Sequence, residues 1–212
     1  MVEHVYRRAS EAAGVDAVVV ATDDARIASA VERFGGVARM TQPGHRTGTD
    51  RIAEVARELR CDIVVNVQGD LPLVEPAMIA ETIEPLDADE SVQMSTLRQV
   101  ISDAADYDNT NVVKVVVDRN GDALYFSRST IPYRREDGTC FKHIGLYGYR
   151  RDFLLIFAAL AQTPLERTES LEQLRALEHG YRIRAMETRF DSIEVDTPED
   201  LERVRRRMAA RV

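Results

Sequence analysis

The fold is indicated most clearly by the segment Ile63-Val64-Val65-Asn66-Val67-Gln68-Gly69-Asp70. Its first five residues are apolar apart from Asn66, which is typical of a strand buried on both faces of a parallel sheet. Gln68-Gly69-Asp70 stands at the carboxyl end of that strand, where open α/β sheets bind their ligands. A carboxylate there suits a hard cation such as Mg²⁺, although a turn residue or a helix cap explains Asp70 equally well.

Amphipathic helices and short apolar runs alternate upstream of this segment. The pattern predicts a helix that carries Val2 to Ala12 and ends at Gly14, a strand over Ala17–Ala21, a helix capped by Asp23 or Asp24 and stopped by Gly35-Gly36, and a helix over Arg51–Leu59. Buried strands separated by amphipathic helices indicate a parallel sheet that is covered on both faces.

The second half of the chain has a different pattern, in which strands follow one another without helices between them. Val112–Asp118 and Ala123–Arg128 flank an Asn-Gly turn, which predicts a β-hairpin, and Phe141–Tyr149 predicts a further strand. Helices are expected at the ranges Asp152–Ala161, Ser170–His179 and Pro198–Met208. The predicted fold is therefore an α/β protein with a doubly wound, mostly parallel sheet and an antiparallel insertion at about residues 112–150, in a single domain over residues 1–212.

Composition excludes several classes of function. The 212 residues are 44% hydrophobic and 30% charged, as in an ordinary globular protein, and the net charge of −8 argues against nucleic-acid binding. Because no apolar run approaches the roughly 20 residues of a membrane helix, no membrane association is expected. Cys61 and Cys140 have neither metal-ligand spacing nor a disulfide framework, which fits a reducing cytoplasm.

The beginning of the chain is unusual for this fold class. It opens in a helix, whereas doubly wound sheets ordinarily open with a strand whose following loop contacts phosphate, and no glycine-rich phosphate loop follows later. The expectation is either a fold that starts with a helix or a missing N-terminal strand and loop.

A second carboxylate candidate lies near the C-terminus, in Val195-Asp196-Thr197-Pro198-Glu199-Asp200. Helix capping explains Thr197 and Asp200, but it leaves Asp196 at the end of a strand without a role. Two aspartates at strand ends, Asp70 and Asp196, could hold one Mg²⁺ together, but their spacing in the sequence does not show that they meet.

Three other segments carry polar groups with two readings each. His45–Arg51 is either a capped helix start or a loop that hydrogen-bonds a nucleoside. His143, with Gly145 and Tyr147 on the same strand face, is either a structural histidine or a ligand contact. Glu169, Glu172 and Gln173 are expected on the solvated face of a helix, unless they bind substrate.

Short motifs follow one another in order over residues 1 to about 208: Val19–Asp23, Thr47–Arg51, Val65–Asp70, Asn111–Val116, Leu124–Arg128, His143–Tyr147, Pro164–Glu166, Leu171–Arg175 and Val195–Asp200. This ordered set resembles the 3-deoxy-manno-octulosonate cytidylyltransferase family, the CMP-Kdo synthetases of lipopolysaccharide biosynthesis, with a nucleotide-diphospho-sugar transferase-like fold.

The resemblance implies Mg²⁺-dependent transfer of CMP from CTP to the sugar acid Kdo, with release of pyrophosphate, by a cytoplasmic homodimer built through the antiparallel insertion. It also implies a role for each matching residue. The metal ligands and catalytic residues would be Asp70 and Asp196, the cytidine pocket Thr47, Gly48, Thr49 and Gln68, and the sugar-acid side Arg128, His143, Tyr147, Glu172 and Gln173.

The chain departs from the family pattern at three places. The family's first strand and its basic triphosphate loop are missing before Met1, Leu71 replaces a common glutamate, and Glu194 replaces a common glycine. Losing three cationic contacts to the triphosphate would cost on the order of 5–9 kcal/mol, so the polypeptide as written is expected to be a poor enzyme whose full-length gene product is active. The alternatives are a degenerate noncatalytic paralogue or fragment, and a cytidylyltransferase for a related acid such as 8-amino-Kdo.

Overall fold

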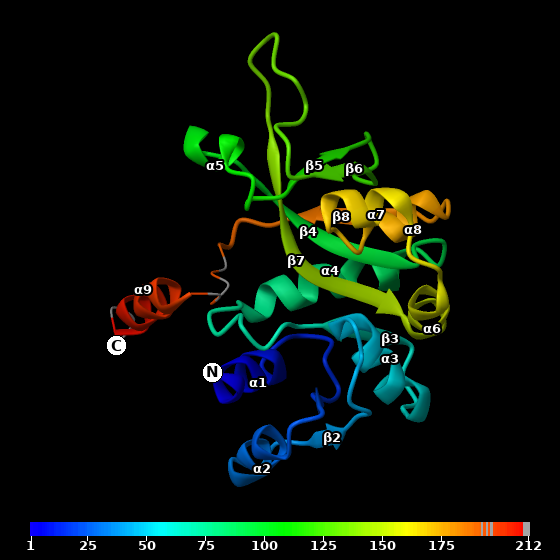
Figure 1. The fold of residues 1–212 in the computed structure, drawn as a ribbon, viewed down its shortest axis with the longest axis vertical. Coiled ribbons are helices and arrows are strands. Elements are labelled where there is room, and N and C mark those ends of the chain that lie inside the picture. The colour runs from blue at the N-terminus through cyan, green and yellow to red at the C-terminus, as the bar shows by residue number, and fades with distance from the viewer. Residues whose placement is uncertain (192, 194, 196, 210–212) are drawn as a thin grey trace. The chain divides into compact units, whose positions relative to one another are not determined.

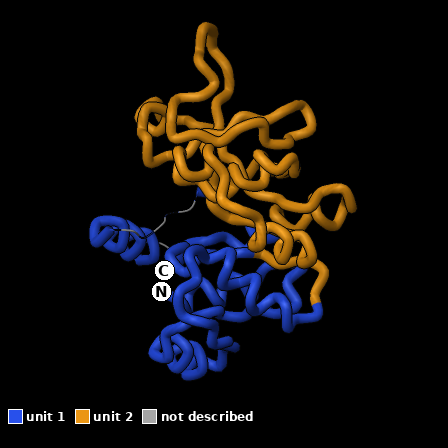
Figure 2. Tube along the Cα trace, turned by 45° about the vertical axis from the view of Figure 1, so that its right-hand side comes forward, with its two compact units in different colours: residues 1–60, 66–80, 191–212 blue, residues 61–65, 81–190 orange. Residues whose placement is uncertain are grey.

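The computed structural model describes residues 1–191, 193, 195 and 197–209. The chain divides into two compact units (Figure 2). The first unit comprises residues 1–60, 66–80 and 191–212, and the second comprises residues 61–65 and 81–190.

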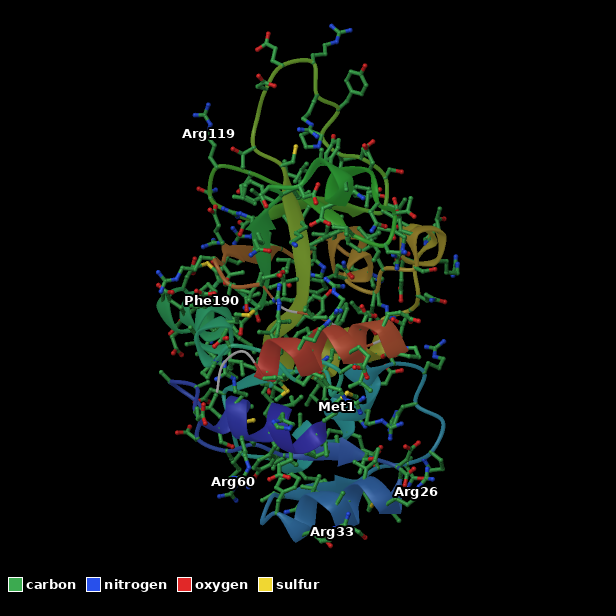
Figure 3. The ribbon with its side chains drawn as sticks, turned by 90° about the vertical axis from the view of Figure 1, so that its left-hand side faces the viewer. Met1, Arg26, Arg33, Arg60, Arg119 and Phe190 are labelled. Atoms are coloured by element: carbon green, nitrogen blue, oxygen red, sulfur yellow. The ribbon has the colours of Figure 1, made fainter. Side chains whose placement is uncertain are left out.

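The first unit contains a parallel pair of strands, β1 (Val20–Thr22) and β2 (Ala38–Met40). Its helices are α1 (Val2–Ser10), α2 (Ala25–Arg33), α3 (Gly48–Glu58) and α9 (Pro198–Ala209). The start of α2 follows from its sequence, because Asp24 accepts the backbone N–H of Arg26 at 2.7 Å and so supplies the cap that a helix N-terminus needs. Figure 3 shows Arg26 and Arg33 on this helix.

The segment after Asp70 is anchored within the first unit. Leu73 packs with Ile193 and with Val204 of α9 in one buried cluster. From α1, Arg8 donates a hydrogen bond from Nε to the Val74 carbonyl at 2.9 Å and forms an ion pair with Glu75. These contacts fix the chain on the C-terminal side of the Gln68–Asp70 turn.

The second unit is built on a sheet with the strand order β6-β5-β7-β4-β8, in which β3 also pairs with β7. The strands are β3 (Ile63–Asn66), β4 (Met94–Val100), β5 (Lys114–Val117), β6 (Ala123–Ser127), β7 (Phe141–Arg150) and β8 (Ile183–Glu187). β8 runs parallel to β4, whereas β7 is antiparallel to β4 and β5, and β5 is antiparallel to β6. Figure 1 shows β4 and β7 side by side along this sheet, and the loop between β6 and β7 projecting beyond it.

Helices complete the second unit: most of α4 (Pro76–Ala88), then α5 (Ala104–Asp108), α6 (Arg151–Ala159), α7 (Pro164–Glu169) and α8 (Leu174–Glu178). The core includes a stack in which the ring of Tyr149 on β7 lies 6.0 Å from that of Phe157 on α6. Phe157 in turn stacks on Phe153 at 6.0 Å. This aromatic layer holds α6 against the sheet.

The α/β class and the antiparallel insertion predicted from the sequence are confirmed. The Asn-Gly turn joins β5 to β6 as expected, with Gly121 at φ 83° and Asp118 Oδ1 accepting the N–H of Asn120 at 2.8 Å. Arg119 lies in this turn, as labelled in Figure 3.

The helix predicted over 170–179 is wrong in its first half. α7 ends at Glu169, Ser170 adopts the left-handed conformation with φ 53°, and α8 begins only at Leu174. Six elements were not predicted from the sequence: β2, α4, β4, α5, α7 and β8. Across the residues that the structure describes, every helix falls short of the length and apolarity needed to cross a membrane.

Candidate functional site

Asp70 lies in the turn that follows β3, and its side chain is half-buried. Its backbone carbonyl accepts a hydrogen bond from the N–H of Val195 at 3.0 Å. Two segments that are 125 positions apart in the sequence therefore meet at Asp70. Val195 is the residue directly before Asp196, so the second predicted carboxylate follows this contact in the sequence.

Asp196 itself lies outside the described residues, and its pairing with Asp70 stays a prediction. Among the described residues no group of three or more His, Cys, Asp or Glu side chains that could hold a metal is found. The donors still suit Mg²⁺, because this ion binds proteins through one or two carboxylates and keeps the rest of its shell as water or substrate phosphate. The Val195–Asp70 bond is the structural observation that fits a two-carboxylate site of this kind.

The start of α3 holds the residues predicted for the cytidine pocket. Thr47 is the N-cap, and its Oγ1 accepts the N–H of Asp50 at 3.1 Å. Thr49 is buried at 3% exposure, whereas Gly48 is exposed. A Cβ on Gly48 would lie 3.8 Å from Gln68 Oε1, so the structure brings the α3 start beside the end of β3. The capping interpretation of this segment is confirmed, and its nucleoside contact stays a prediction.

Arg51 on α3 ties three elements of the first unit together. Its Nη1 donates to Thr41 Oγ1 at 2.5 Å, directly after β2, and its Nη2 donates to Asp23 Oδ2 at 3.0 Å, directly after β1. The guanidinium thereby fixes the carboxyl ends of both strands relative to the α3 start. Arg51 belongs to the Thr47–Arg51 motif, but no role was predicted for it from the sequence.

Arg128 follows β6 in the second unit and is held by Glu169, the last residue of α7. The N–H of Arg128 donates to Glu169 Oε2 at 3.0 Å, and its Nε donates to the Glu169 carbonyl at 3.0 Å. Ser127 Oγ donates to Glu169 Oε1 at 2.6 Å. Burial raises the pKa of Glu169, but these hydrogen bonds outweigh it, so the pKa lies below its usual range and the group is a carboxylate.

The guanidinium of Arg128 keeps part of its donor set available. Nη1 donates to the Thr110 carbonyl at 3.3 Å, and Nη2 has no hydrogen-bond partner among the residues that the structure describes. An arginine fixed on one side and open on the other can present N–H donors to a planar carboxylate. Arg128 therefore fits the acid-binding role that the sequence analysis gives it.

Lys114 is fully buried at the start of β5. Its Nζ donates to the carbonyls of Asn109, Val112 and Arg128 at 2.9, 2.6 and 2.7 Å. Burial lowers the pKa of the ammonium, and the nearby Arg128 charge lowers it further. Lys114 thus fixes the backbone on which Arg128 stands.

His143 lies on β7 with its ring between two aromatic side chains. The ring centroid is 5.0 Å from that of Phe126 and 5.4 Å from that of Tyr147, so two of the predicted sugar-side residues are in contact. Burial lowers the pKa of His143 to about 3, and the imidazole is therefore neutral near pH 7. A neutral ring cannot supply charge to an anion, but it can exchange hydrogen bonds with hydroxyl groups.

Glu172 and Gln173 lie between α7 and α8. Gln173 is only 3% exposed, which corrects its assignment to a solvated helix face, and its buried Nε2 has no hydrogen-bond partner within the described part of the chain. Glu172 is half-buried, and its Oε1 accepts from Arg175 Nη2 at 3.5 Å. A buried amide with an open donor is a costly feature that a bound acceptor would relieve.

A buried ion pair holds the backbone around these two residues. Arg175 of α8 donates from Nε to Glu166 Oε2 of α7 at 2.8 Å, and both side chains are less than 5% exposed. Burial raises the pKa of Glu166, but hydrogen bonds from Arg175 and from the Thr163 N–H bring it below its usual range. The pair closes the α7–α8 corner that carries Gln173.

Glu169 was expected on a solvated helix face, and no role was predicted for Lys114, Arg175 or Thr96, a buried β4 residue beside His143. One signal was present, since Lys114 is a charged residue inside the apolar run Val112–Val117. Glu169 contacts Arg128 over 41 positions and Thr96 contacts His143 over 47, so neither contact leaves a local pattern. Arg175 pairs with Glu166, nine positions earlier, across the α7–α8 corner. Leu71, the departure from the family's glutamate, is 2% exposed and contributes an apolar side chain to the core.

Comparison with known proteins shows the family to which this chain belongs. A family model described as cytidylyltransferase matches residues 1–184. The 3-deoxy-manno-octulosonate cytidylyltransferase of Geobacter metallireducens is 57% identical over 96% of this chain and 85% of its own length. The protein of that name from Pelobacter propionicus is 55% identical over 99% of this chain and 88% of its own length.

Among solved structures, a CMP:2-keto-3-deoxy-manno-octonic acid synthetase complexed with CTP superposes with a TM-score of 0.95 at 44% identity. The match covers all of this chain and 88% of that one. A 4-diphosphocytidyl-2C-methyl-D-erythritol synthase from Anaerococcus prevotii, with a TM-score of 0.64 at 13% identity over 98% of this chain and 86% of its own, shares the fold. With a matching family model over most of its length and relatives above half identity, this chain belongs to the cytidylyltransferase family of enzymes.

Proposed function

We propose that this protein transfers CMP from CTP to 3-deoxy-D-manno-octulosonate (Kdo) and releases pyrophosphate, in the synthesis of lipopolysaccharide. Relatives of 55–57% identity carry the name of that activity, and the solved relative at 44% identity holds CTP. The observation in this structure that carries the proposal is the Val195–Asp70 backbone bond, because it joins the two segments with the predicted metal-binding carboxylates.

Asp70 and Asp196 would hold Mg²⁺ in this proposal. When bound, the ion neutralises charge on the nucleotide phosphates and so favours attack at phosphorus. The carboxylate donors of these two residues fit its preference for oxygen ligands. In the same unit, Thr47, Gly48, Thr49 and Gln68 would contact the cytidine, with Gln68 Oε1 beside the α3 start.

The residues of the second unit would bind the sugar acid. Arg128 offers its open N–H donors to the carboxylate, and the buried Gln173 Nε2 offers a further donor. Neutral His143, Tyr147 and Glu172 would contact hydroxyl groups. Because Glu169 and Lys114 fix the backbone of Arg128, the acid would be oriented with little reorganisation of the protein.

The proposed chemistry is a single in-line displacement. The 2-hydroxyl oxygen of the sugar acid forms a bond to the α-phosphorus of CTP and gives its proton to solvent water, while the bond from that phosphorus to the oxygen that bridges to the β-phosphate breaks and pyrophosphate leaves with that oxygen. Such transfers depend mainly on positioning and on neutralising charge rather than on covalent steps by the protein. The residues described above serve these two tasks.

Release of pyrophosphate by the purified full-length protein tests this function. We expect turnover that needs CTP, Kdo and Mg²⁺ together, with ATP, GTP and UTP at least about a hundredfold less effective. Turnover with 8-amino-Kdo but not with Kdo would support the related enzyme instead. Binding of CTP with no turnover of either acid would support a noncatalytic paralogue.

We also propose a homodimer built through residues 112–150 and a cytoplasmic location. This region exposes apolar side chains, with Tyr133 86% exposed and Leu124 63% exposed, and such groups are common where subunits meet. The two cysteines are free thiols, which suits a reducing compartment. Light scattering at several concentrations tests the dimer, and Leu124→Lys should shift it toward monomer while Leu165→Lys, an exposed leucine outside the region, should not.

A further inference from the structure

Thr96 is a completely buried residue on β4 that faces an irregularity in the neighbouring strand. Along the antiparallel β4–β7 pair, Thr96 lies opposite Tyr147, and the next residue, Leu97, lies opposite Ile144. Gly145 and Leu146 therefore have no counterpart on β4. The bulge they form turns backbone carbonyl groups toward the threonine side chain.

The Thr96 hydroxyl has three neighbours within hydrogen-bond distance. Its Oγ1 lies 2.9 Å from the Leu146 carbonyl oxygen, 3.2 Å from the Ile144 carbonyl oxygen and 2.9 Å from His143 Nε2. A hydroxyl has one proton to donate and two lone pairs that accept. The two carbonyl oxygens can only accept, so they compete for that single proton.

This competition determines the proton on His143. If Thr96 gave its proton to the imidazole, its oxygen lone pairs would face two carbonyl oxygens, one at 2.9 Å, with no hydrogen between them. If Thr96 donates to the Leu146 carbonyl, a lone pair remains for a proton on His143 Nε2, and every contact is satisfied. The second arrangement places the histidine proton on Nε2.

The other ring nitrogen, Nδ1, is then a pure acceptor. It has no hydrogen-bond partner among the residues that the structure describes, and the half-buried ring is held by Phe126 and Tyr147. An unprotonated ring nitrogen attracts a donor and repels the lone pairs of a carboxylate. Nδ1 thus suits a hydroxyl donor of a ligand, whereas the Arg128 guanidinium suits a carboxylate.

We propose that Thr96 is a positioning residue that holds His143 as the Nε2–H tautomer, so that Nδ1 accepts a hydrogen bond from a hydroxyl group of the sugar acid. The proposal rests on the proposed function for the identity of the ligand. The tautomer itself is a property of the protein without substrate, and it is tested separately.

The first measurement is nitrogen NMR of the full chain labelled with ¹⁵N in its four histidines, without substrate. His143→Gln identifies the His143 signals by their loss. We expect Nε2 to show the shift and coupling of a protonated nitrogen and Nδ1 those of an unprotonated one. A proton on Nδ1 in the unaltered protein overturns the proposal, whatever any variant does.

The second measurement compares three variants. Thr96→Val, which keeps the side-chain shape, should let a measurable fraction of the proton move to Nδ1 and should raise KM for Kdo about tenfold, with kcat and KM for CTP within twofold. Thr96→Ser should restore both the tautomer and KM. Ser95→Ala is the matched control, because it removes a buried hydroxyl of the same strand that donates to the Thr82 carbonyl at 2.5 Å, away from His143.

The outcomes separate the two claims. If Thr96→Val fails to fold, the tautomer of the unaltered protein and the behaviour of Thr96→Ser still decide. A KM increase in Thr96→Val with an unchanged tautomer, or an equal increase in Ser95→Ala, overturns the role of Thr96. Absence of turnover with Kdo in the unaltered protein overturns the proposed function, whereas the NMR result decides the tautomer independently of it.

Discussion

Arg128 and Glu169 hold each other through both their backbones and their side chains. The Arg128 N–H donates to the Glu169 carboxylate at 3.0 Å, while the Arg128 guanidinium donates to the Glu169 carbonyl at 3.0 Å. A loop residue after β6 is thereby fixed to the end of α7. The proposed acid-binding guanidinium is consequently oriented before any substrate arrives, which lowers the cost of binding.

Glu169→Ala should weaken the binding of Kdo. Removing the carboxylate leaves the Arg128 N–H and the Ser127 hydroxyl without their acceptor, so the guanidinium loses its fixed orientation. We expect KM for Kdo to rise about tenfold, with KM for CTP within twofold. Glu178→Ala is the control, since Glu178 also accepts from backbone N–H groups but at the start of α7. A KM for Kdo that matches the control would contradict this role of Glu169.

Lys114→Met should destabilise the second unit. Methionine has a similar length but no donor, so three backbone carbonyl groups would lose the Nζ hydrogen bonds that now satisfy them. We expect the free energy of unfolding to fall by about 3 kcal/mol, measured by urea denaturation. Lys142→Met is the comparison, because Lys142 is a half-buried lysine of the same sheet whose Nζ donates to the Asp106 carboxylate at 3.2 Å rather than to these three carbonyl groups. Equal losses in the two variants would show that the buried network adds nothing.

Arg175→Met should lower the free energy of unfolding, because it leaves the buried Glu166 carboxylate without its cation. The carboxylate would remain inside the α7–α8 corner without its cation, and removing one partner of a buried pair typically costs about 3–5 kcal/mol. Adding Glu166→Gln should recover part of that loss, because it removes the uncompensated charge. The free energies of unfolding of the two single variants and the double variant check the coupling. Strictly additive losses would mean that the pair is not coupled.

The stability that the Glu166–Arg175 pair contributes should depend on pH. In the unaltered protein the pKa of Glu166 lies below its ordinary value, so the pair's contribution is complete above that value and decreases as the pH falls through the lowered pKa. In Arg175→Met burial should raise the pKa above the unfolded value, so that variant gains stability as acid neutralises the carboxyl. The deficit of Arg175→Met should therefore shrink from pH 7 to about pH 5.

The low pKa of His143 predicts a second effect of pH on stability, in a different pH range. Burial lowers its pKa from 6.5 to about 3, so between these values the unfolded chain binds a proton that the folded protein does not. Stability therefore falls as the pH drops from 6.5 toward 3, and His143→Gln removes this contribution. The difference in unfolding free energy between the two proteins should change steadily through this window. A difference that is independent of pH would refute the low pKa.

The sequence predicts the elements whose patterns are local. The Asn-Gly turn, the Asp24 and Thr47 caps and the apolar run before Gln68 each act within a few residues, and the structure contains all of them. The β4 strand was not predicted, because Ser95 and Thr96 interrupt its apolar pattern. Both are wholly buried, and their hydroxyl groups are satisfied by Thr82, His143 and the β7 carbonyls.

The candidate site likewise contains residues that the sequence indicates and residues that depend on contacts distant in the sequence. Asp70 was singled out because a strand precedes it, His143 because of its place on a strand face, and Arg128 through the ordered motifs; their roles in the site stay predictions. Glu169 and Gln173 were expected on a solvated helix, yet Ser170 in the left-handed conformation ends α7 and turns Gln173 into the interior. The periodicity of apolar residues does not indicate such a turn, and the buried Glu166–Arg175 pair, which closes the same corner, forms only in the folded chain.

Pyrophosphate release by Asp70→Asn, measured beside Asp62→Asn, tests the two-carboxylate site most directly. Asp62 precedes β3 and is exposed, whereas Asp70 follows β3, so the control changes the same group at the other end of one strand. We predict that Asp70→Asn lowers kcat with CTP, Kdo and Mg²⁺ at least about a hundredfold, and that Asp62→Asn stays within twofold of the unaltered protein. Turnover by Asp70→Asn equal to that of Asp62→Asn would contradict the assignment of Asp70 to the metal site.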